Sequence, residues 1–376
     1  MTAPNVVIVS NDIVPGMGMP VAAPGLRAWG LALGLGAHGW DPTLVVMGGP
    51  VSTQWQGTAP PPTPAGAVVV SEADLEAFVG ERAPVTVVLT NTNQARRLVH
   101  RDDVRVIVDL FSPQVLERVS RDTVDRAAVR RLRDRKLAGL RLADGFVVNG
   151  AKKVPYFLGW MTRAGIDVRS KPIEVVEMAL PIQRHDRDPA SPLRVLVAGY
   201  LQRWSSPGAW IRPMARLLDE GSVELHLVTP VHWGQPDAAD LGSAYDDLLG
   251  RPGVVRHEAM RFGDFRRLLA HVDVALDLFP WSLEREFAMV TRSVVALASG
   301  VPVVHPPFTE VAPLVDEYGA GWLVDPSDET AVARLLAGLA GDPSEVVRRS
   351  RGAERLGRER LDVGVAVEPL ARMLAA

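Results

Sequence analysis

Short, continuously apolar runs recur along this chain and constrain its fold more than any other feature. The clearest runs are Asn5–Ser10, Thr43–Met47, Val85–Leu89, Val104–Asp109 and Leu193–Ala198. Runs of this kind are typical of strands in the middle of a parallel sheet, where both faces are covered. Helical segments separate them, so the sequence predicts an α/β protein built from strand–helix–strand units.

The alternation of predicted strands and helices is interrupted once along the chain and then resumes. Pro181–Pro192 is polar, charged and bounded by proline, which is typical of a domain boundary. We therefore expect a first Rossmann-like domain at residues 1–183, a second at 184–355, and a helical tail at 356–376. The boundary also contains Asp186-Arg187-Asp188, formally a carboxylate pair for a divalent cation, but no strand precedes it and we expect no metal there.

Composition narrows the class of protein. The chain has 376 residues, of which 47% are hydrophobic and 23% charged, with a net charge of −3, which is ordinary for a globular protein and argues against a dedicated nucleic-acid binder. It has no cysteines, which excludes disulfides and thiolate metal sites. We find no signal peptide and no run long enough to span a bilayer, so we expect a cytoplasmic protein. Arg121–Leu142 is dense in arginine and predicts a solvated, salt-bridged helix, with peripheral membrane contact as the alternative.

Leu283–Val304 holds the strongest candidate site. Two carboxylates, Glu284 and Glu286, precede a short apolar helix that opens with Thr291-Arg292-Ser293, ends before Gly300 and leads into a buried strand. A helix N-terminus that follows a loop in an open α/β sheet binds phosphate through its free N–H groups and its positive dipole end. The alternative is a plain buried helix–strand unit whose Arg292 is surface charge.

Polar or glycine residues also follow other predicted strands. Gly16 and Gly18 allow a ligand to approach the backbone after the first strand, although their spacing is not the full dinucleotide fingerprint. Asp109 ends a strand, where a carboxylate can accept a proton or orient a hydroxyl, or else cap the next helix. Arg203 follows Leu193–Ala198, where a cation can reach a diphosphate.

Five segments together resemble the GT-B glycosyltransferases, specifically the retaining family 4, over almost the whole chain. They are PGLRAWGLALGLGAHGWDPTLV, ADGFVVNGAKKVPYFLGWM, AGYLQRWSSP, RFGDFRRLLAHVDVALDLFPWSLEREFAMVTRSVVALASGVPVV and GAGWLVDPSDETAVARLLAGL. The resemblance implies two Rossmann-like doubly wound domains that face each other across a cleft, with a C-terminal helix packed back on the first domain.

The resemblance also implies a function and site roles. A sugar would pass from a nucleotide sugar, such as a UDP- or GDP-sugar, to a natural product, glycan or lipid intermediate, with retention and without a metal or cofactor. Arg203, Thr291, Arg292 and Ser293 would bind the donor diphosphate, and Gly16 and Gly18 would border the donor sugar. Glu284 or Glu286 would hold sugar hydroxyls, and Asp109 would act as a catalytic or acceptor-orienting group.

Two positions depart from the family pattern. Val295 stands where the family has a glutamate that contacts ribose, and no lysine accompanies Arg203. These departures leave a second hypothesis, a nucleotide-sugar-binding partner with weak or no activity, and a third, a GT-B sugar-nucleotide epimerase.

Overall fold

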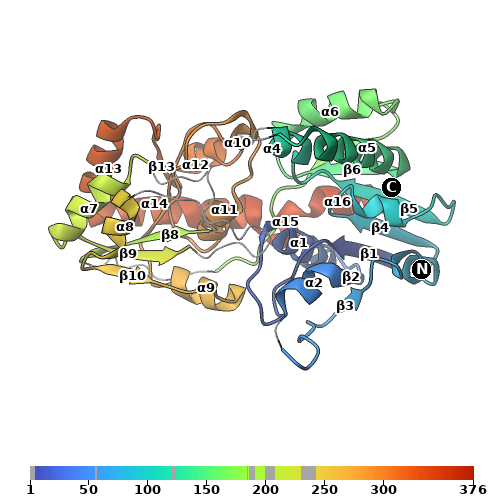
Figure 1. Cartoon of the computed structure of the whole chain (residues 1–376), viewed down its shortest axis with the longest axis horizontal. Helices are drawn as coiled ribbons and strands as arrows, with labels where there is room; N and C mark the ends of the chain where they lie inside the picture. The colour runs from blue at the N-terminus through green and yellow to red at the C-terminus, as the bar shows by residue number, and fades with distance from the viewer. Residues whose placement is uncertain are drawn as a thin grey trace. The chain divides into compact units, whose positions relative to one another are not determined.

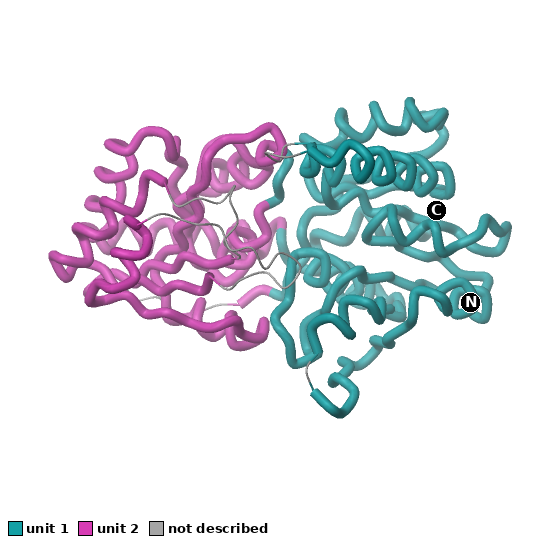
Figure 2. The backbone as a smooth tube through the Cα atoms, in the orientation of Figure 1, with its two compact units in different colours: residues 1–181, 287–289, 361–376 teal, residues 182–286, 290–360 magenta. Residues whose placement is uncertain are grey.

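The computed structural model describes residues 5–55, 57–119, 124–183, 185, 191–199, 208–229 and 243–376. The chain divides into two compact units, shown in teal and magenta in Figure 2. Unit 1 consists of residues 1–181, 287–289 and 361–376, and unit 2 of residues 182–286 and 290–360. The last sixteen residues therefore belong with the N-terminal part of the chain, as expected for a C-terminal helix that packs back on the first domain.

Unit 1 is built on a parallel sheet. Its described residues form seven strands in the order β3-β2-β1-β4-β5-β6-β7, and every pairing is parallel. The strands are β1 (Asn5–Ser10), β2 (Pro42–Met47), β3 (Ala67–Val70), β4 (Val85–Leu89), β5 (Val104–Asp109), β6 (Gly145–Val148) and β7 (Ile173–Val175). The strand order reverses between β1 and β4, and ligands of open α/β sheets bind at the carboxyl ends of the strands at such a point.

Helices cover both faces of this sheet (Figure 1). They are α1 (Ala23–Ala37), α2 (Gly48–Gln54), α3 (Leu75–Gly80), the 3₁₀ helix η1 (Gln94–Arg97), α4 (Gln114–Val119), α5 (Arg126–Leu142), α6 (Lys153–Arg163), α15 (Val363–Ala366) and α16 (Glu368–Ala375). Successive side chains of β1 enter different cores: Val6 and Ile8 pack with residues of α1 and α16, whereas Val7 and Val9 pack with residues of α5 and α6. A strand buried on both faces explains why β1 reads as an unbroken apolar run.

Unit 2 repeats the architecture. Its described residues form six parallel strands in the order β10-β9-β8-β11-β12-β13. They are β8 (Leu193–Ala198), β9 (Val223–Val228), β10 (Val254–Arg256), β11 (Val274–Leu276), β12 (Val303–His305) and β13 (Gly321–Leu323). The helices are α7 (Ile211–Asp219), α8 (Ser243–Leu249), α9 (Phe262–Leu269), α10 (Leu283–Glu286), α11 (Thr291–Ala298), α12 (Ala312–Tyr318), α13 (Glu329–Gly341), α14 (Pro343–Leu356) and the π-helical turn η3 (Gly357–Leu361). Here the strand order reverses between β8 and β11.

The structure corrects several local predictions. The short helices α2 and α4 were not predicted. The arginine-rich helix starts at Arg126, because the Asp125 side chain accepts hydrogen bonds from the amides of Ala127 and Ala128 and caps it there. Within the described residues, no helix is long and apolar enough to cross a lipid bilayer.

Candidate functional sites

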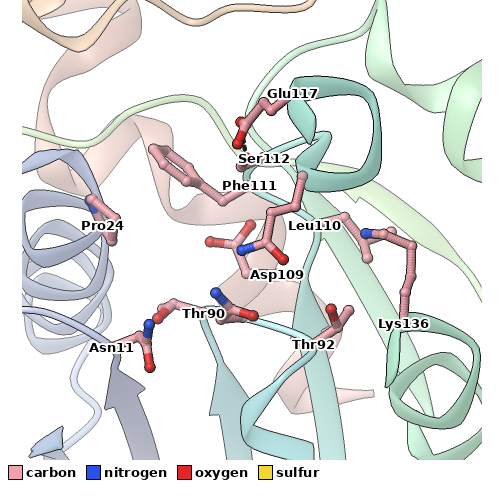
Figure 3. Close-up of a pocket in the computed structure, with 12 residues that line it drawn as sticks. Asn11, Pro24, Thr90, Thr92, Asp109, Leu110, Phe111, Ser112, Glu117 and Lys136 are labelled. Atoms are coloured by element: carbon pink, nitrogen blue, oxygen red, sulfur yellow. Dashed lines mark hydrogen bonds between the residues drawn. The ribbon is translucent and has the colours of Figure 1, made fainter. Parts of the chain in front are cut away.

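A polar cavity of about 330 Å³ lies at the carboxyl ends of the unit 1 strands (Figure 3). Its walls come from the segments after β1, β4 and β5, from the start of α1 and from α4 and α5. The lining residues are Asn11, Pro24, Thr90, Asn91, Thr92, Asp109, Leu110, Phe111, Ser112, Gln114, Glu117 and Lys136. Small-ligand pockets typically measure about 300–1,000 Å³, so the cavity is large enough for a small ligand.

Asp109 borders this cavity and is held by a buried arginine. Its Oδ2 accepts a hydrogen bond from Arg27 Nε at 2.8 Å, and its Oδ1 accepts one from Arg27 Nη2 at 3.3 Å. Arg27 Nη1 also donates to the carbonyls of Val176 and Glu177, at 2.8 Å and 2.6 Å. Burial raises the pKa of Asp109, and the positive charge of Arg27 opposes that rise. The predicted helix cap is wrong, because α4 begins at Gln114 and the carboxylate is bound to Arg27 instead.

A lysine and a glutamate also line this cavity. Lys136 is 1% exposed, and burial lowers its pKa to about 8, while the nearby Glu117 opposes that change. The Glu117 carboxylate accepts a hydrogen bond from the Ser112 hydroxyl. Sequence reasoning missed Lys136, and the only signal for it was a lone lysine in a helix otherwise rich in arginine.

Gly16 and Gly18 do not line this cavity. Both have positive φ, at 97° and 74°, a region that favours glycine. A Cβ on Gly16 would lie 3.1 Å from Pro64 Cβ, and one on Gly18 would lie 3.4 Å from Pro62 Cγ, so both glycines face the proline-rich segment. The nearby Asp12 is buried, and burial raises its pKa to about 6, although it accepts hydrogen bonds from the Ile13 amide and the Gln54 side chain.

In unit 2, the N-terminus of α11 follows the strand at which the sheet order reverses. Asp277, the residue after β11, accepts hydrogen bonds from Arg292 Nε and from the Ser293 hydroxyl. Val290 at the N-cap provides no side-chain hydrogen bond to the first turn of the helix. Arg292 also lies against the end of β8, because a Cβ on Gly199 would come within 2.8 Å of its Nη1. The structure thus brings Thr291, Arg292 and Ser293 together at this edge of the sheet, with Asp277 orienting the last two.

The hydrogen-bond chain continues into the core of unit 2. The Ser293 Oγ lies 3.1 Å from His305 Nδ1, and His305 Nε2 lies 2.7 Å from Thr309 Oγ1. His305 is fully buried, and burial lowers the pKa of its imidazole to about 4, so the ring is neutral at physiological pH. Asp277 and His305 were not predicted, and a polar residue at the end of each apolar run was the available signal.

The two predicted carboxylates are engaged within their own segment. Glu284 is 7% exposed and forms an ion pair with the adjacent Arg285. Glu286 accepts a hydrogen bond from Trp281 Nε1 at 2.8 Å. Both residues lie on α10, which precedes the α11 N-terminus in the chain, and both carboxylates already have hydrogen-bonding or ion-pair partners in their own segment.

Arg203 and the Asp186-Arg187-Asp188 pair lie outside the described residues. In the part of the chain that is described, no group of three or more histidine, aspartate or glutamate side chains is arranged to hold a metal ion. The rings of His226 and His257 stack at 13° from parallel, and His226 Nδ1 lies 3.0 Å from His257 Nε2. His226 Nε2 lies 2.7 Å from Glu224 Oε1.

The structure is similar to solved glycosyltransferases along nearly its whole length. Sucrose-phosphate synthase from Thermosynechococcus elongatus matches with a TM-score of 0.71 at 13% identity, with 99% of each chain covered. HepE from Anabaena, in complex with UDP and glucose, matches with a TM-score of 0.67 at 14% identity and 99% coverage of each chain. An α-glucosyltransferase in complex with UDP and a 13-mer DNA containing an HMU base matches with a TM-score of 0.66 at 9% identity, with 100% of each chain covered.

No protein-family model matches the sequence, and no curated protein matches it. The solved structures are GT-B glycosyltransferases, and at such low identity the likeness concerns the fold alone. The two parallel-sheet Rossmann-like units of this chain have the GT-B fold.

Proposed function

We propose that this protein is a glycosyltransferase that moves a sugar from a nucleotide-sugar donor to a small-molecule, glycan or lipid acceptor. The bond between the anomeric carbon and the diphosphate breaks, a bond between that carbon and an acceptor hydroxyl oxygen forms, and the hydroxyl proton passes to the released diphosphate. The observation that carries the proposal is the α11 N-terminus, which opens at the carboxyl edge of the unit 2 sheet beside its point of reversal, in a chain with the GT-B fold.

The donor diphosphate is assigned to this edge of unit 2. The departing diphosphate gains negative charge, and preorganised N–H groups and cations stabilise that charge. The first-turn amides of α11 supply the N–H groups, and the ion pair with Asp277 holds the Arg292 guanidinium in one place. Arg203 follows β8, the neighbouring strand, and is proposed as a second cation. Glu284 and Glu286 are proposed to contact donor sugar hydroxyls, and Gly16 and Gly18 to border the sugar.

The acceptor is assigned to the unit 1 cavity. Asn11, Thr90, Asn91 and Gln114 offer hydroxyl and amide groups to a polyhydroxylated ligand. Because Arg27 holds the Asp109 carboxylate, we assign Asp109 an orienting role at the edge of this cavity. Retention of configuration and independence of a metal are proposed from the family resemblance of the sequence.

Thermal melting against UDP, GDP, dTDP, ADP and their common sugars tests the donor site. A ligand at one hundred times its Kd stabilises the folded state by about 2.7 kcal/mol, which gives a visible shift. We expect a shift with one base, and its loss in Arg292→Ala when each variant is compared with its own ligand-free melt. Arg212→Ala, at an exposed arginine of α7 in the same unit, is the matched control and should keep the shift. No shift with any nucleotide would contradict the proposal.

A non-catalytic nucleotide-sugar binder is the second candidate. The family's ribose-binding glutamate position holds Val295, which is 3% exposed and has no polar side-chain atom. A nucleotide shift without transfer or hydrolysis of any donor would favour this candidate over a transferase.

A further inference from the structure

Lys136 is an unusual residue in this chain. Of the 41 basic residues only four are lysines, namely Lys136, Lys152, Lys153 and Lys171. Lys136 lies on α5, where all six arginines are exposed or half-buried at the protein surface, yet it is 1% exposed and lines the unit 1 cavity. A lysine in this position forgoes hydration, which is costly unless a partner replaces the water.

The structure provides little to replace that water. The ammonium lies 5.1 Å from the centre of the Phe157 ring and 6.0 Å from that of Trp160. Among the described residues, no hydrogen bond or salt bridge to Lys136 is formed. Glu117 is the acidic group that acts on it, and the Glu117 carboxylate is engaged by the Ser112 hydroxyl.

Two carboxylates border the cavity, those of Asp109 and Glu117. Asp109 is neutralised by its ion pair with Arg27, and the positive charge of Lys153 also acts on it. Figure 3 shows Lys136 extending from α5 toward Leu110, while Glu117 and Ser112 meet at another part of the wall. The cavity wall therefore holds a buried ammonium without a hydrogen-bonded partner among the described residues, beside hydroxyl and amide groups and the Glu117 carboxylate.

We propose that Lys136 binds an acidic group, a carboxylate or a phosphate, on the ligand that enters the unit 1 cavity. With the acceptor assigned to this cavity, the inference rests on the proposed function and deepens it: the acceptor carries an oxyanion. Charge-assisted hydrogen bonds from an ammonium to an oxyanion are about twice as strong as neutral ones, and a buried site strengthens them further. Bound oxyanion also favours the charged form of Lys136, so ligand binding raises its pKa from about 8.

The experiment is a pH titration of the protein labelled with ¹³C at the lysine Cε, in which four lysines give four side-chain signals. Glucose, glucuronate and glucose 6-phosphate are the probes, together with acetate and inorganic phosphate; the sugars share a ring and differ at C6. We expect at least one oxyanion probe to raise the pKa of Lys136 by one unit or more, with glucose and sodium chloride at equal ionic strength having no effect. Response to glucuronate and acetate identifies a carboxylate, and response to glucose 6-phosphate and inorganic phosphate identifies a phosphate.

Two lysine variants test whether the binding depends on Lys136. Lys136→Met places an apolar side chain beside Phe157 and Trp160, so it should fold and should lose oxyanion binding measured by calorimetry. Lys152→Gln, at an exposed lysine, should retain binding. An unchanged Lys136 titration with every oxyanion, or equal binding by Lys136→Met, would overturn the inference. A nucleotide melting shift that persists in that case would leave the proposed function standing, whereas oxyanion binding without any nucleotide shift would remove the transferase proposal alone.

Discussion

Buried ionisable side chains gather at the carboxyl ends of both sheets. Asp109 and Lys136 lie there in unit 1, and Asp277 and His305 in unit 2. Burial of a charge is costly unless a partner compensates for it, so each group is expected to depend strongly on its neighbours. This dependence makes substitutions at single residues informative.

Asp109→Ala should destabilise the protein by about 3–5 kcal/mol, because it leaves the buried Arg27 charge without its partner. Urea unfolding of unit 1, followed by hydrogen exchange of β1 and β5 amides, measures the loss. Asp103→Ala is the matched control, since Asp103 directly precedes β5 and pairs with Arg101 at the exposed surface. Equal losses of stability in the two variants would show that the buried Arg27–Asp109 pair contributes no more to folding than an exposed ion pair.

His305 should make stability fall as pH falls. Its folded pKa of about 4 lies below the unfolded value of 6.5, so between these values the unfolded state binds more protons than the folded state. The free energy of unfolding should therefore drop by about 2 kcal/mol between pH 7 and pH 5 from this residue. His305→Gln should remove that part of the pH dependence in urea titrations, and His100→Gln, at an exposed histidine, should not. The same pH slope in wild type and His305→Gln would contradict the assignment.

Glycines determine how α1 packs. Three glycines of this helix face backbone or side-chain atoms of other segments: Gly25 faces the Ile13 carbonyl, Gly30 the Ala179 carbonyl, and Gly34 the Val363 carbonyl and Val367. Each would place a Cβ within 2.5 Å of such an atom. Glycine is unfavourable in a helix interior, so close approach of the chain is the physical reason for its use here.

Two glycines of α1 should respond oppositely to alanine. Gly34→Ala should destabilise by about 1–3 kcal/mol, because its Cβ would lie 2.5 Å from the Val363 carbonyl oxygen. At Gly36 a Cβ would meet nothing within 4 Å, so Gly36→Ala should stabilise by about 0.5–1 kcal/mol. Thermal melting of both variants measures the difference, and a stabilising Gly34→Ala would refute the packing argument.

The C-terminal segment of the chain packs within unit 1. The Leu180 amide donates to the Leu361 carbonyl at 2.8 Å, and Val367, Leu370 and Leu374 enter the core that also contains Leu31 of α1. The C-terminal helices are therefore part of the first unit's core.

Truncation after Asp362 should consequently lower the stability of unit 1 and leave that of unit 2 unchanged. It removes α15 and α16, which exposes the apolar side of α1. Hydrogen exchange should accelerate in α1 and β2 peptides and stay unchanged in β9 and α13 peptides. Equal acceleration in both units would show that they unfold as one cooperative body.

The sequence by itself determined the elements whose signals are local. The apolar runs predicted the parallel strands. As expected, α11 ends before Gly300, which has a φ of 68° and follows the C-cap residue Ser299. Asp328 caps α13 by accepting a hydrogen bond from the Ala331 amide at 2.9 Å, which is a signal of the same local kind. Such signals work because periodicity, caps and stops act within a few residues.

Only the tertiary structure decided the partners of the site residues. Asp109 pairs with Arg27, 82 positions away, and Asp277 orients Arg292 and Ser293 from the end of another strand. Lys136 is buried, although its helix reads as solvated, because α5 packs against α4 and α6 and the ammonium lies over the Phe157 ring of α6. These contacts depend on which strand ends the parallel sheet brings together, and no local pattern in the sequence carries that information.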